Sequence, residues 1–227
     1  MNIGERLETI GRLVPEGSVL ADIGTDHGYL PVWLLRQGRI SRAIAGDIAA
    51  GPCQAARNTV ALYGLQDKVE VRQGSGLEVL QPEEADCIVI AGMGGSTIIS
   101  ILSAAPETAR SAGLLVLQPM AGAAGLRRWL TENDWQITDE ELTDDPPHFY
   151  EIICARPGRD KIYSAAEYAV GPALLRKKHR LLGRQIARQI EGCRQLLFNM
   201  ERSERARASA KYREHKALLA ALEVLQR

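Results

Sequence analysis

Short apolar segments alternate with helix-like segments over the first two thirds of the chain. Five apolar runs have the length and composition of buried strands, at residues 18–23, 41–47, 69–73, 86–92 and 113–119. Helix-like segments lie between or after them, at residues 29–38, 51–64, 95–105 and 124–134. Continuous apolar strands connected by helices are typical of a parallel sheet with both faces covered. The pattern therefore predicts an α/β fold built on an open, doubly wound sheet.

Two more strand-like segments follow, at residues 135–142 and 148–156, with a short acidic loop between them. We expect this pair to join the sheet as a final antiparallel hairpin. In open α/β sheets, ligands bind beyond the carboxyl ends of the strands, where the strand order switches. The residues that directly follow each strand are therefore the first candidates for a functional site.

The last third of the chain has helical periodicity. The segment RPGRDK at 156–161 interrupts the earlier pattern, which predicts domains at 1–158 and 159–227. Apolar positions spaced by three, four and seven residues predict one helix over 172–200 and a second over 203–226. Two long helices joined by a short turn form an antiparallel hairpin, with the packing of a coiled coil along the apolar stripe.

Composition narrows the class of protein. The chain has 227 residues, 45% of them hydrophobic, and equal numbers of basic and acidic residues. No run is long enough to span a bilayer, and the first residues lack the apolar core of a secretory signal, so we expect a cytoplasmic protein. The four cysteines are isolated in the sequence, which argues against disulfides and against a zinc site. We therefore expect no metal.

The balanced charge conceals an asymmetry. Residues 1–158 carry 12 basic and 21 acidic residues, a net charge of −9, and residues 159–227 carry 16 and 7, a net charge of +9. A basic tail on an acidic domain suggests a polyanionic partner. The charge pattern fits equally well a helical hairpin whose basic residues only cover its solvated face.

The first predicted strand ends in the pattern Asp22-x-Gly24-x-Asp26-x-Gly28. The glycines leave room for a ligand at the start of the next helix, where backbone N–H groups point outward. The dinucleotide pattern G-x-G-x-x-G is absent. The pattern resembles motif I of class I S-adenosylmethionine-dependent methyltransferases, whose cofactor carries an ammonium and a sulfonium instead of a pyrophosphate.

The next two strands end in residues suited to a nucleoside. Asp47, at the end of the second strand, is placed to accept hydrogen bonds from ribose hydroxyls, with a helix N-cap as the alternative role. Ser75 follows the third strand, where many methyltransferases have an acid that meets the adenine amino group. The adenine contact is then expected from the backbone or from Gln73.

The fourth predicted strand runs directly into glycines, in IVIAGMGGSTI at 88–98. This stretch resembles the bacterial TrmK family of tRNA (adenine-N1)-methyltransferases, together with RLETIGRLVPEGSVLADIGTDHGYLP at 6–31, GPCQAARN at 51–58, LQP at 117–119 and FYEII at 149–153. That family acts on the adenine at tRNA position 22. The resemblance extends over essentially the whole chain, including the helical hairpin. Ser75 and Met120 are departures from the family pattern.

The resemblance implies S-adenosyl-L-methionine as cofactor and tRNA as partner. The implied cofactor-binding residues are Asp22, Gly24, Thr25, Gly28, Asp47, Ile48, Gly74, Ser75, Gly76, Ala91 and Gly92. The loop of residues 91–95 is then expected at the transferred methyl group, with Gly92, Met93 and Gly94 beside the target base. The motif that grips an exocyclic amine in N6-adenine methyltransferases is missing here, which fits a ring nitrogen as the target.

Four further residues are candidates for contact with the target base. Asp26 and His27 follow the first strand, although Asp26 is equally suited to bind the cofactor ammonium and His27 to cap the helix. Tyr29 and Tyr150 are candidates to stack on a base, with simple packing as the alternative. N1 of adenine already has an in-plane lone pair, so we expect catalysis mainly by positioning.

The remaining predicted contacts to the substrate lie after the fifth strand and in the tail. They are Gln118, Pro119, Arg176, Lys177, Lys178, Arg180 and Arg184. Phosphate contacts from such basic residues supply affinity without reading sequence. Two other functions stay open at this point, a methyltransferase of small molecules and a non-catalytic tRNA- or cofactor-binding protein. We expect a monomer or a weak dimer.

Overall fold

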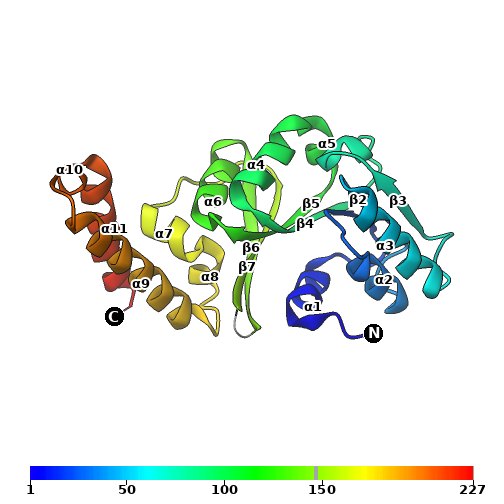
Figure 1. Ribbon diagram of the computed structural model, residues 1–227, viewed down its shortest axis with the longest axis horizontal. Coiled ribbons are helices and arrows are strands. Elements are labelled where there is room, and N and C mark those ends of the chain that lie inside the picture. Colours follow the sequence, from blue (N-terminus) through cyan, green and yellow to red (C-terminus); the bar gives the residue numbers. More distant parts are fainter. Residues whose placement is uncertain (146–147, 227) are drawn as a thin grey trace. The chain divides into compact units, whose positions relative to one another are not determined.

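The computed structural model describes residues 1–145 and 148–226 and divides the chain into two compact units, Met1–Lys161 and Ile162–Arg227. The first unit is built on a seven-stranded sheet with the order β3-β2-β1-β4-β5-β7-β6 (Figure 1). The strands are β1 (Val19–Ile23), β2 (Arg42–Asp47), β3 (Val69–Gln73), β4 (Cys87–Gly94), β5 (Leu114–Ala121), β6 (Trp135–Asp145) and β7 (His148–Pro157). The first five are parallel, and β7 is antiparallel to both β5 and β6. The predicted doubly wound α/β fold is confirmed.

Helices cover both faces of this sheet. They are α1 (Gly4–Leu13), α2 (Tyr29–Arg36), α3 (Ala50–Leu62), the short 3-10 helix η1 (Gly76–Val79), α4 (Gly95–Ala104), α5 (Pro106–Ser111) and α6 (Ala123–Glu132). Side chains of α1, α2 and α3 share one apolar core with β1, β2 and β4, including Ile10, Leu34 and Val60. The helices α4 and α6 contact each other and pack on β4 and β5. The sequence pattern did not predict α1, η1 or α5.

The edge of the sheet is fastened by a buried charged cluster. Arg127 of α6 donates hydrogen bonds to Glu140 of β6 and to Glu151 of β7, and both arginine and Glu140 are fully buried. Burying a charge is costly unless it is paired and hydrogen-bonded, so these three side chains depend on one another. The cluster ties the antiparallel hairpin to the helix layer. The predicted acidic loop of this hairpin is partly strand, because β6 continues to Asp145, and its remainder lies outside the described residues.

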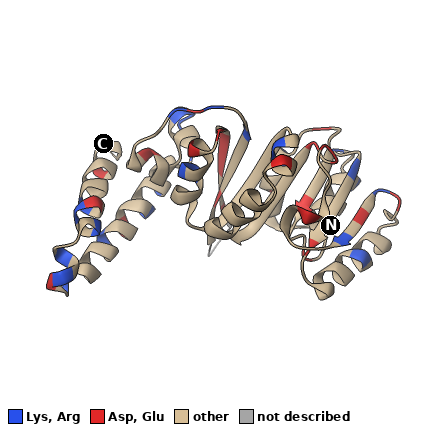
Figure 2. Ribbon diagram, turned by 90° about the horizontal axis from the view of Figure 1, so that it is seen from above, with Lys and Arg blue, Asp and Glu red and all other residues tan. Residues whose placement is uncertain are grey.

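The second unit is helical throughout its regular structure. Its helices are α7 (Ala165–Val170), α8 (Pro172–Arg176), α9 (Leu182–Glu201), α10 (Glu204–Arg207) and α11 (Ala210–Leu225). The long helices α9 and α11 pack together around Ile186, Ile190 and Leu222. Figure 2 shows that basic residues recur along this unit, including at the turn that carries α10.

Both predicted tail helices are wrong in their extent. The predicted helix over 172–200 is interrupted at 177–181, where Lys178 adopts a left-handed backbone with φ of 51°. The predicted helix over 203–226 is also divided, since Ser203 and Ser209 each accept a backbone hydrogen bond as N-caps and start α10 and α11 separately. No helix in the described part of the chain is long and apolar enough to span a membrane.

Candidate functional site

Two cavities adjoin at the carboxyl ends of the parallel strands, and Gly24 lines both of them. The first, here called the β1 cavity, has a volume of 280 Å³ and is lined in part by Arg6, Asp22, Thr25, Asp26, His27 and Tyr29. The second, here called the β2 cavity, has a volume of 230 Å³ and is lined in part by Asp47, Ile48, Gly74, Ser75, Gly76 and Met93. Residues from four predicted loops are thus brought together, as expected for a sheet of this topology.

Asp22 provides a buried carboxylate in the β1 cavity. It is only 6% exposed, and Thr25 donates a hydrogen bond of 2.7 Å from Oγ1 to its Oδ2. Burial raises the pKa of the Asp22 carboxyl from 3.8 to about 6, while the hydrogen bond from Thr25 and the positive charge of Arg6 partly offset this rise. A strongly perturbed carboxyl in a cleft is typical of a functional site. A cationic ligand group would stabilise its charged form.

Asp26 and His27 form an exposed patch at the mouth of the same cavity. Asp26 has a left-handed backbone with φ of 53°, and its N–H lies 3.3 Å from Oδ2 of Asp47. The His27 ring stacks on Tyr29 with 5.1 Å between centroids, and its Nε2 lies 3.7 Å from Oδ1 of Asp26. Tyr29 is 42% exposed. The stacked rings present an aromatic surface to the cavity beside a carboxylate.

Asp47 organises the β2 cavity. Its Oδ1 accepts a hydrogen bond of 3.0 Å from the N–H of Ala49, and its Oδ2 accepts the bond from Asp26. The carboxylate therefore joins the loops that follow β1 and β2. Ala49 is the N-cap residue of α3, so the hydrogen bond from its N–H to Asp47 holds the residue at which that helix begins. The alternative role as the N-cap residue is therefore wrong, whereas the position of Asp47 in the lining of the cavity is compatible with a contact to ribose.

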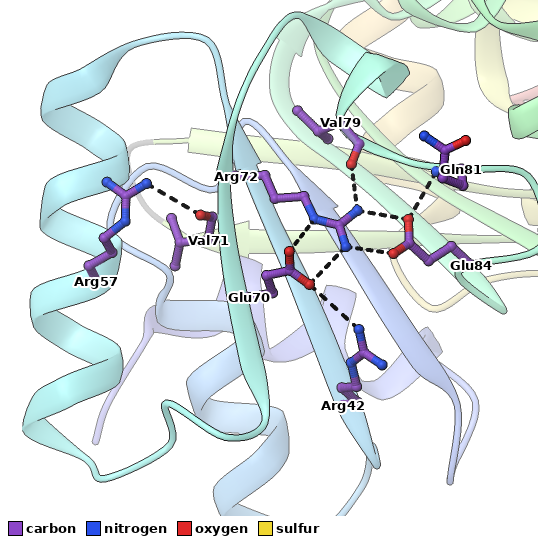
Figure 3. Close-up of polar contacts among 8 residues, drawn as sticks. All are labelled: Arg42, Arg57, Glu70, Val71, Arg72, Val79, Gln81 and Glu84. Carbon is purple, nitrogen blue, oxygen red and sulfur yellow. Dashed lines mark hydrogen bonds and ion pairs between the residues drawn. The ribbon is translucent and has the colours of Figure 1, made fainter.

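The third loop is held by a network around Arg72 (Figure 3). The Arg72 guanidinium donates to both carboxylate oxygens of Glu84, to Glu70 and to the carbonyl of Val79. These contacts hold the pKa of Glu84 down at about 2, chiefly through the hydrogen bonds from Arg72. The network fixes η1 beside β3. The intervening residues Gly74, Ser75 and Gly76 are thereby held at the β2 cavity.

The glycines at the end of β4 and the start of α4 differ in what the structure requires of them. Gly92 has φ of +79°, a left-handed conformation that favours glycine. A Cβ at Gly95 would lie 2.7 Å from the carbonyl oxygen of Gly122, so this glycine allows α4 to approach the start of α6. Gly94 has an extended backbone, and a Cβ there would be in ordinary contact with the hydroxyl oxygens of Thr97 and Ser96 at 3.8 and 3.9 Å, so neither conformation nor space requires a glycine. Met93 lies against Gly24, where a Cβ would be 2.2 Å from the Met93 methyl carbon.

Arg6 is a site residue that the sequence pattern missed. It lines the β1 cavity from α1, and its Nη1 donates a hydrogen bond of 2.8 Å to Oε1 of Gln118. Its guanidinium carbon lies 5.5 Å from the centre of the Tyr150 ring, within the range of a cation–π contact. No carboxylate in the described part of the chain forms an ion pair with Arg6. A single arginine in an unassigned N-terminal segment gives no local signal of such a role.

Six of the ligand contacts predicted in residues 1–158 line neither cavity, namely Gly28, Gly92, Gly94, Gln118, Pro119 and Tyr150. The structure buries Gln118 and Pro119, and the Gln118 amide is engaged by Arg6 and Gly92, so neither side chain is exposed at the two cavities. Gly28 is not among the residues that line the two cavities. It has φ of +67° and packs against Ala56, where a Cβ would be 3.2 Å from the alanine methyl, so it serves the approach of α2 to α3.

Comparison with known proteins agrees with this geometry. Residues 3–153 match the family model described as a methyltransferase domain. The tRNA (adenine(22)-N(1))-methyltransferase of Bacillus subtilis is 39% identical over 184 residues, which are 79% of this chain and 77% of that protein. The chain belongs to the tRNA (adenine(22)-N(1))-methyltransferase family.

Solved structures of family members share the entire fold. The crystal structure of the B. subtilis tRNA methyltransferase TrmK has a TM-score of 0.89 and 32% identity, with 100% of this chain and 99% of that chain covered. A Streptococcus pneumoniae protein solved in complex with S-adenosyl-L-methionine has a TM-score of 0.87 and 31% identity, with both chains fully covered. The resemblance to the TrmK family that the sequence motifs indicate is therefore confirmed.

The basic residues predicted to bind tRNA lie in the second unit of this family member. Arg176 ends α8, Lys177, Lys178 and Arg180 follow in the segment before α9, and Arg184 lies in the first turns of α9. All five side chains are exposed. Their role as tRNA contacts stays a prediction.

Proposed function

We propose that this protein uses S-adenosyl-L-methionine to methylate N1 of the adenine at position 22 of tRNA. The observation that carries the proposal is that a buried carboxylate, Asp22, and a cation, Arg6, line the same cavity, which adjoins the cavity lined by Asp47. Membership of the tRNA (adenine(22)-N(1))-methyltransferase family supports the same reaction.

The residues present fit this cofactor from end to end. An amino-acid group carries an ammonium and a carboxylate, and the β1 cavity offers Asp22 for the first and Arg6 for the second. Asp47 in the β2 cavity is suited to accept hydrogen bonds from two ribose hydroxyls. Gly24 lines both cavities, so a ligand that spans them passes over a residue with no side chain.

The bound cofactor supplies an electrophilic methyl group on a sulfonium. Neutral adenine presents an in-plane lone pair at N1, so the chain needs no general base to generate the nucleophile. Its contribution is to hold the reacting atoms in line at about 3–3.5 Å, which removes much of the entropic barrier. N1 lies on the Watson–Crick edge, so the base has to be unpaired or flipped out before it reaches the site.

Three residues at the mouth of the β1 cavity are suited to receive the base. The His27 and Tyr29 rings form a stacked aromatic surface, and base–aromatic stacking contributes about 1–3 kcal/mol. The Asp26 carboxylate lies beside these rings, and the methylated base is a cation. Asp26 therefore stabilises the product side of the reaction by its charge.

The helical unit supplies affinity for the tRNA body. Its exposed cations include Arg176, Lys177, Lys178, Arg180 and Arg184. Contacts of this kind bind phosphates regardless of sequence and weaken with salt. In this division of labour, residues 1–158 bind the cofactor and perform the transfer, and residues 159–227 hold the tRNA. The protein acts in the compartment where tRNA is modified, the cytoplasm.

Methyl transfer from labelled cofactor to a tRNA transcript tests the proposal. Nucleoside analysis should give 1-methyladenosine from a transcript with adenine at position 22 and none from a matched transcript with guanine there. Equal labelling of both transcripts would refute the assigned position. Tight cofactor binding without labelled product would instead indicate a non-catalytic protein or a small-molecule methyltransferase.

A further inference from the structure

The parallel ladder between β4 and β5 is irregular at two consecutive places at the proposed site of transfer, with Gly92 inserted on β4 and Met120 inserted on β5. Ala91 pairs with Gln118 and Met93 pairs with Pro119, so Gly92 is inserted between two consecutive pairs. Its φ of +79° is that of a glycine bulge. Proline has no N–H, so β5 offers no backbone donor opposite Met93. The bulge therefore relies on contacts outside the ladder.

The Gln118 side chain supplies such a contact. Its Oε1 accepts hydrogen bonds from the Gly92 N–H at 3.2 Å and from Nη1 of Arg6 at 2.8 Å, and the whole side chain is buried. Its Nε2 faces the sulfur of Met120 at 3.5 Å. The two ends of an amide are chemically distinct, and two donors converge on the oxygen. Arg6 therefore fixes which end of the amide faces Gly92.

The residues on either side of the bulge line different cavities. Ala91 lines the β1 cavity and Met93 lines the β2 cavity. Met93 also lies against Gly24, the residue common to both. Because successive residues are connected through the Gly92 peptide, its rotation would move Met93 relative to Gly24. The hydrogen bond from the Gly92 N–H to Gln118 therefore helps to fix the shape of the surface on which cofactor and base would meet.

We infer that Gln118, oriented by Arg6, is a positioning residue that fixes the Gly92 bulge and thereby the place of Met93. It acts through backbone and touches no ligand. The expected effect on kcat rests on the proposed function, whereas the expected effect on the position of Gly92 and Met93 does not. In kinetic terms, Gln118 contributes to the alignment of the methyl group with N1.

Two substitutions of Gln118 distinguish the effect of its hydrogen-bond acceptor from the effect of its side-chain volume. Gln118→Glu keeps an oxygen for both Arg6 and Gly92, and Gln118→Leu removes it at similar size. Gln136→Leu, at an exposed position of β6, is the matched control. Protein labelled with ¹³C at its four methionine methyls reports Met93, assigned through Met93→Leu, and amide hydrogen exchange reports the Gly92 N–H.

The leucine variant should speed exchange at Gly92, shift the Met93 methyl resonance and lower kcat about tenfold or more, since misplacement of about 1 Å can cost about a hundredfold. The glutamate variant should stay within about threefold of wild type in kcat and retain both spectroscopic signatures. If Gln118→Leu does not fold, Gln118→Asn, which withdraws the oxygen by one methylene, should give the same spectroscopic changes.

The inference is overturned if the folded variant leaves Gly92 exchange and the Met93 resonance as in wild type, or if Gln118→Glu behaves like Gln118→Leu. A wild-type protein that methylates no tRNA would refute the proposed function alone. The exchange and methyl measurements need neither tRNA nor turnover, so they decide the role of Gln118 in either case.

Discussion

Replacement of Asp22 by asparagine should change how stability depends on pH. The folded protein raises the pKa of this carboxyl from 3.8 to about 6. A difference of about two pH units at 1.36 kcal/mol per unit corresponds to about 3 kcal/mol between its neutral and charged forms. The folded pKa is the higher one. The contribution of Asp22 to stability is therefore complete below about pH 4 and lost as the pH rises through about 6.

Urea unfolding of wild type and Asp22→Asn over this pH range isolates the effect. Most other carboxyls titrate in both proteins, so their contributions cancel in the difference between the two unfolding free energies. Wild type should lose about 2 kcal/mol relative to the variant between about pH 4.5 and about pH 7.5. If the difference in unfolding free energy between the two proteins does not change with pH, the argument from burial of Asp22 is refuted. If wild type instead becomes more stable relative to the variant at high pH, the folded protein lowers the pKa of Asp22 and does not raise it.

Cofactor binding should depend on pH in the opposite direction. An ammonium group binds the charged form of Asp22, of which only about one tenth is present at about pH 5. The dissociation constant of S-adenosyl-L-methionine, measured by calorimetry, should therefore be about tenfold higher at about pH 5 than at about pH 7. The asparagine variant should bind more weakly and lack this dependence. An equal pH dependence in both proteins would exclude Asp22 as the ammonium partner.

Three other variants, one of them a double substitution, test separate parts of the protein. Asparagine at position 26 can adopt the left-handed backbone of Asp26, so Asp26→Asn should fold. This variant should lower kcat about tenfold or more, while the dissociation constant of the cofactor changes less than about threefold. Equal losses in kcat and in cofactor affinity would show that Asp26 has no role in catalysis. Arg72→Met should destabilise the protein by about 1–3 kcal/mol at neutral pH, and this loss should shrink below about pH 4.5 as Glu84 becomes protonated; a loss independent of pH would contradict the pairing. Arg180→Ala with Arg184→Ala should reduce the salt dependence of tRNA binding by about one unit of slope per lost phosphate contact and leave cofactor binding unchanged, whereas Arg12→Ala should do neither.

The sheet was predictable because its strands are short apolar runs that end in glycine or an acid. Asp22 and Asp47 could be placed on that basis, since the carboxyl ends of parallel strands meet at one edge. The breaks in the tail helices were harder to predict. Ser209 is a recognisable N-cap inside the periodic pattern, whereas the left-handed backbone of Lys178 has no counterpart in local composition.

The contacts around Gln118 could not be predicted for a different reason. Arg6 and Gln118 are 112 residues apart, and their hydrogen bond depends on where α1 packs against the end of β5. Periodicity identifies the end of that strand but does not distinguish a side chain that faces a ligand from one that holds the backbone beneath it. The prediction that Gln118 and Pro119 contact the substrate was based on the strand end alone, and the structure shows both side chains buried.

The glycine-rich surface of the site limits how the protein can change under selection. A side chain at Gly24 would meet Met93, one at Gly95 would meet the backbone of Gly122, and one at Gly92 would be strained by its left-handed backbone. If an inhibitor binds mainly to the main-chain atoms of these glycines, few substitutions could weaken its binding without also disrupting the site. Resistance would then have to arise at exposed side chains of the site, such as Ile48 in the lining of the β2 cavity.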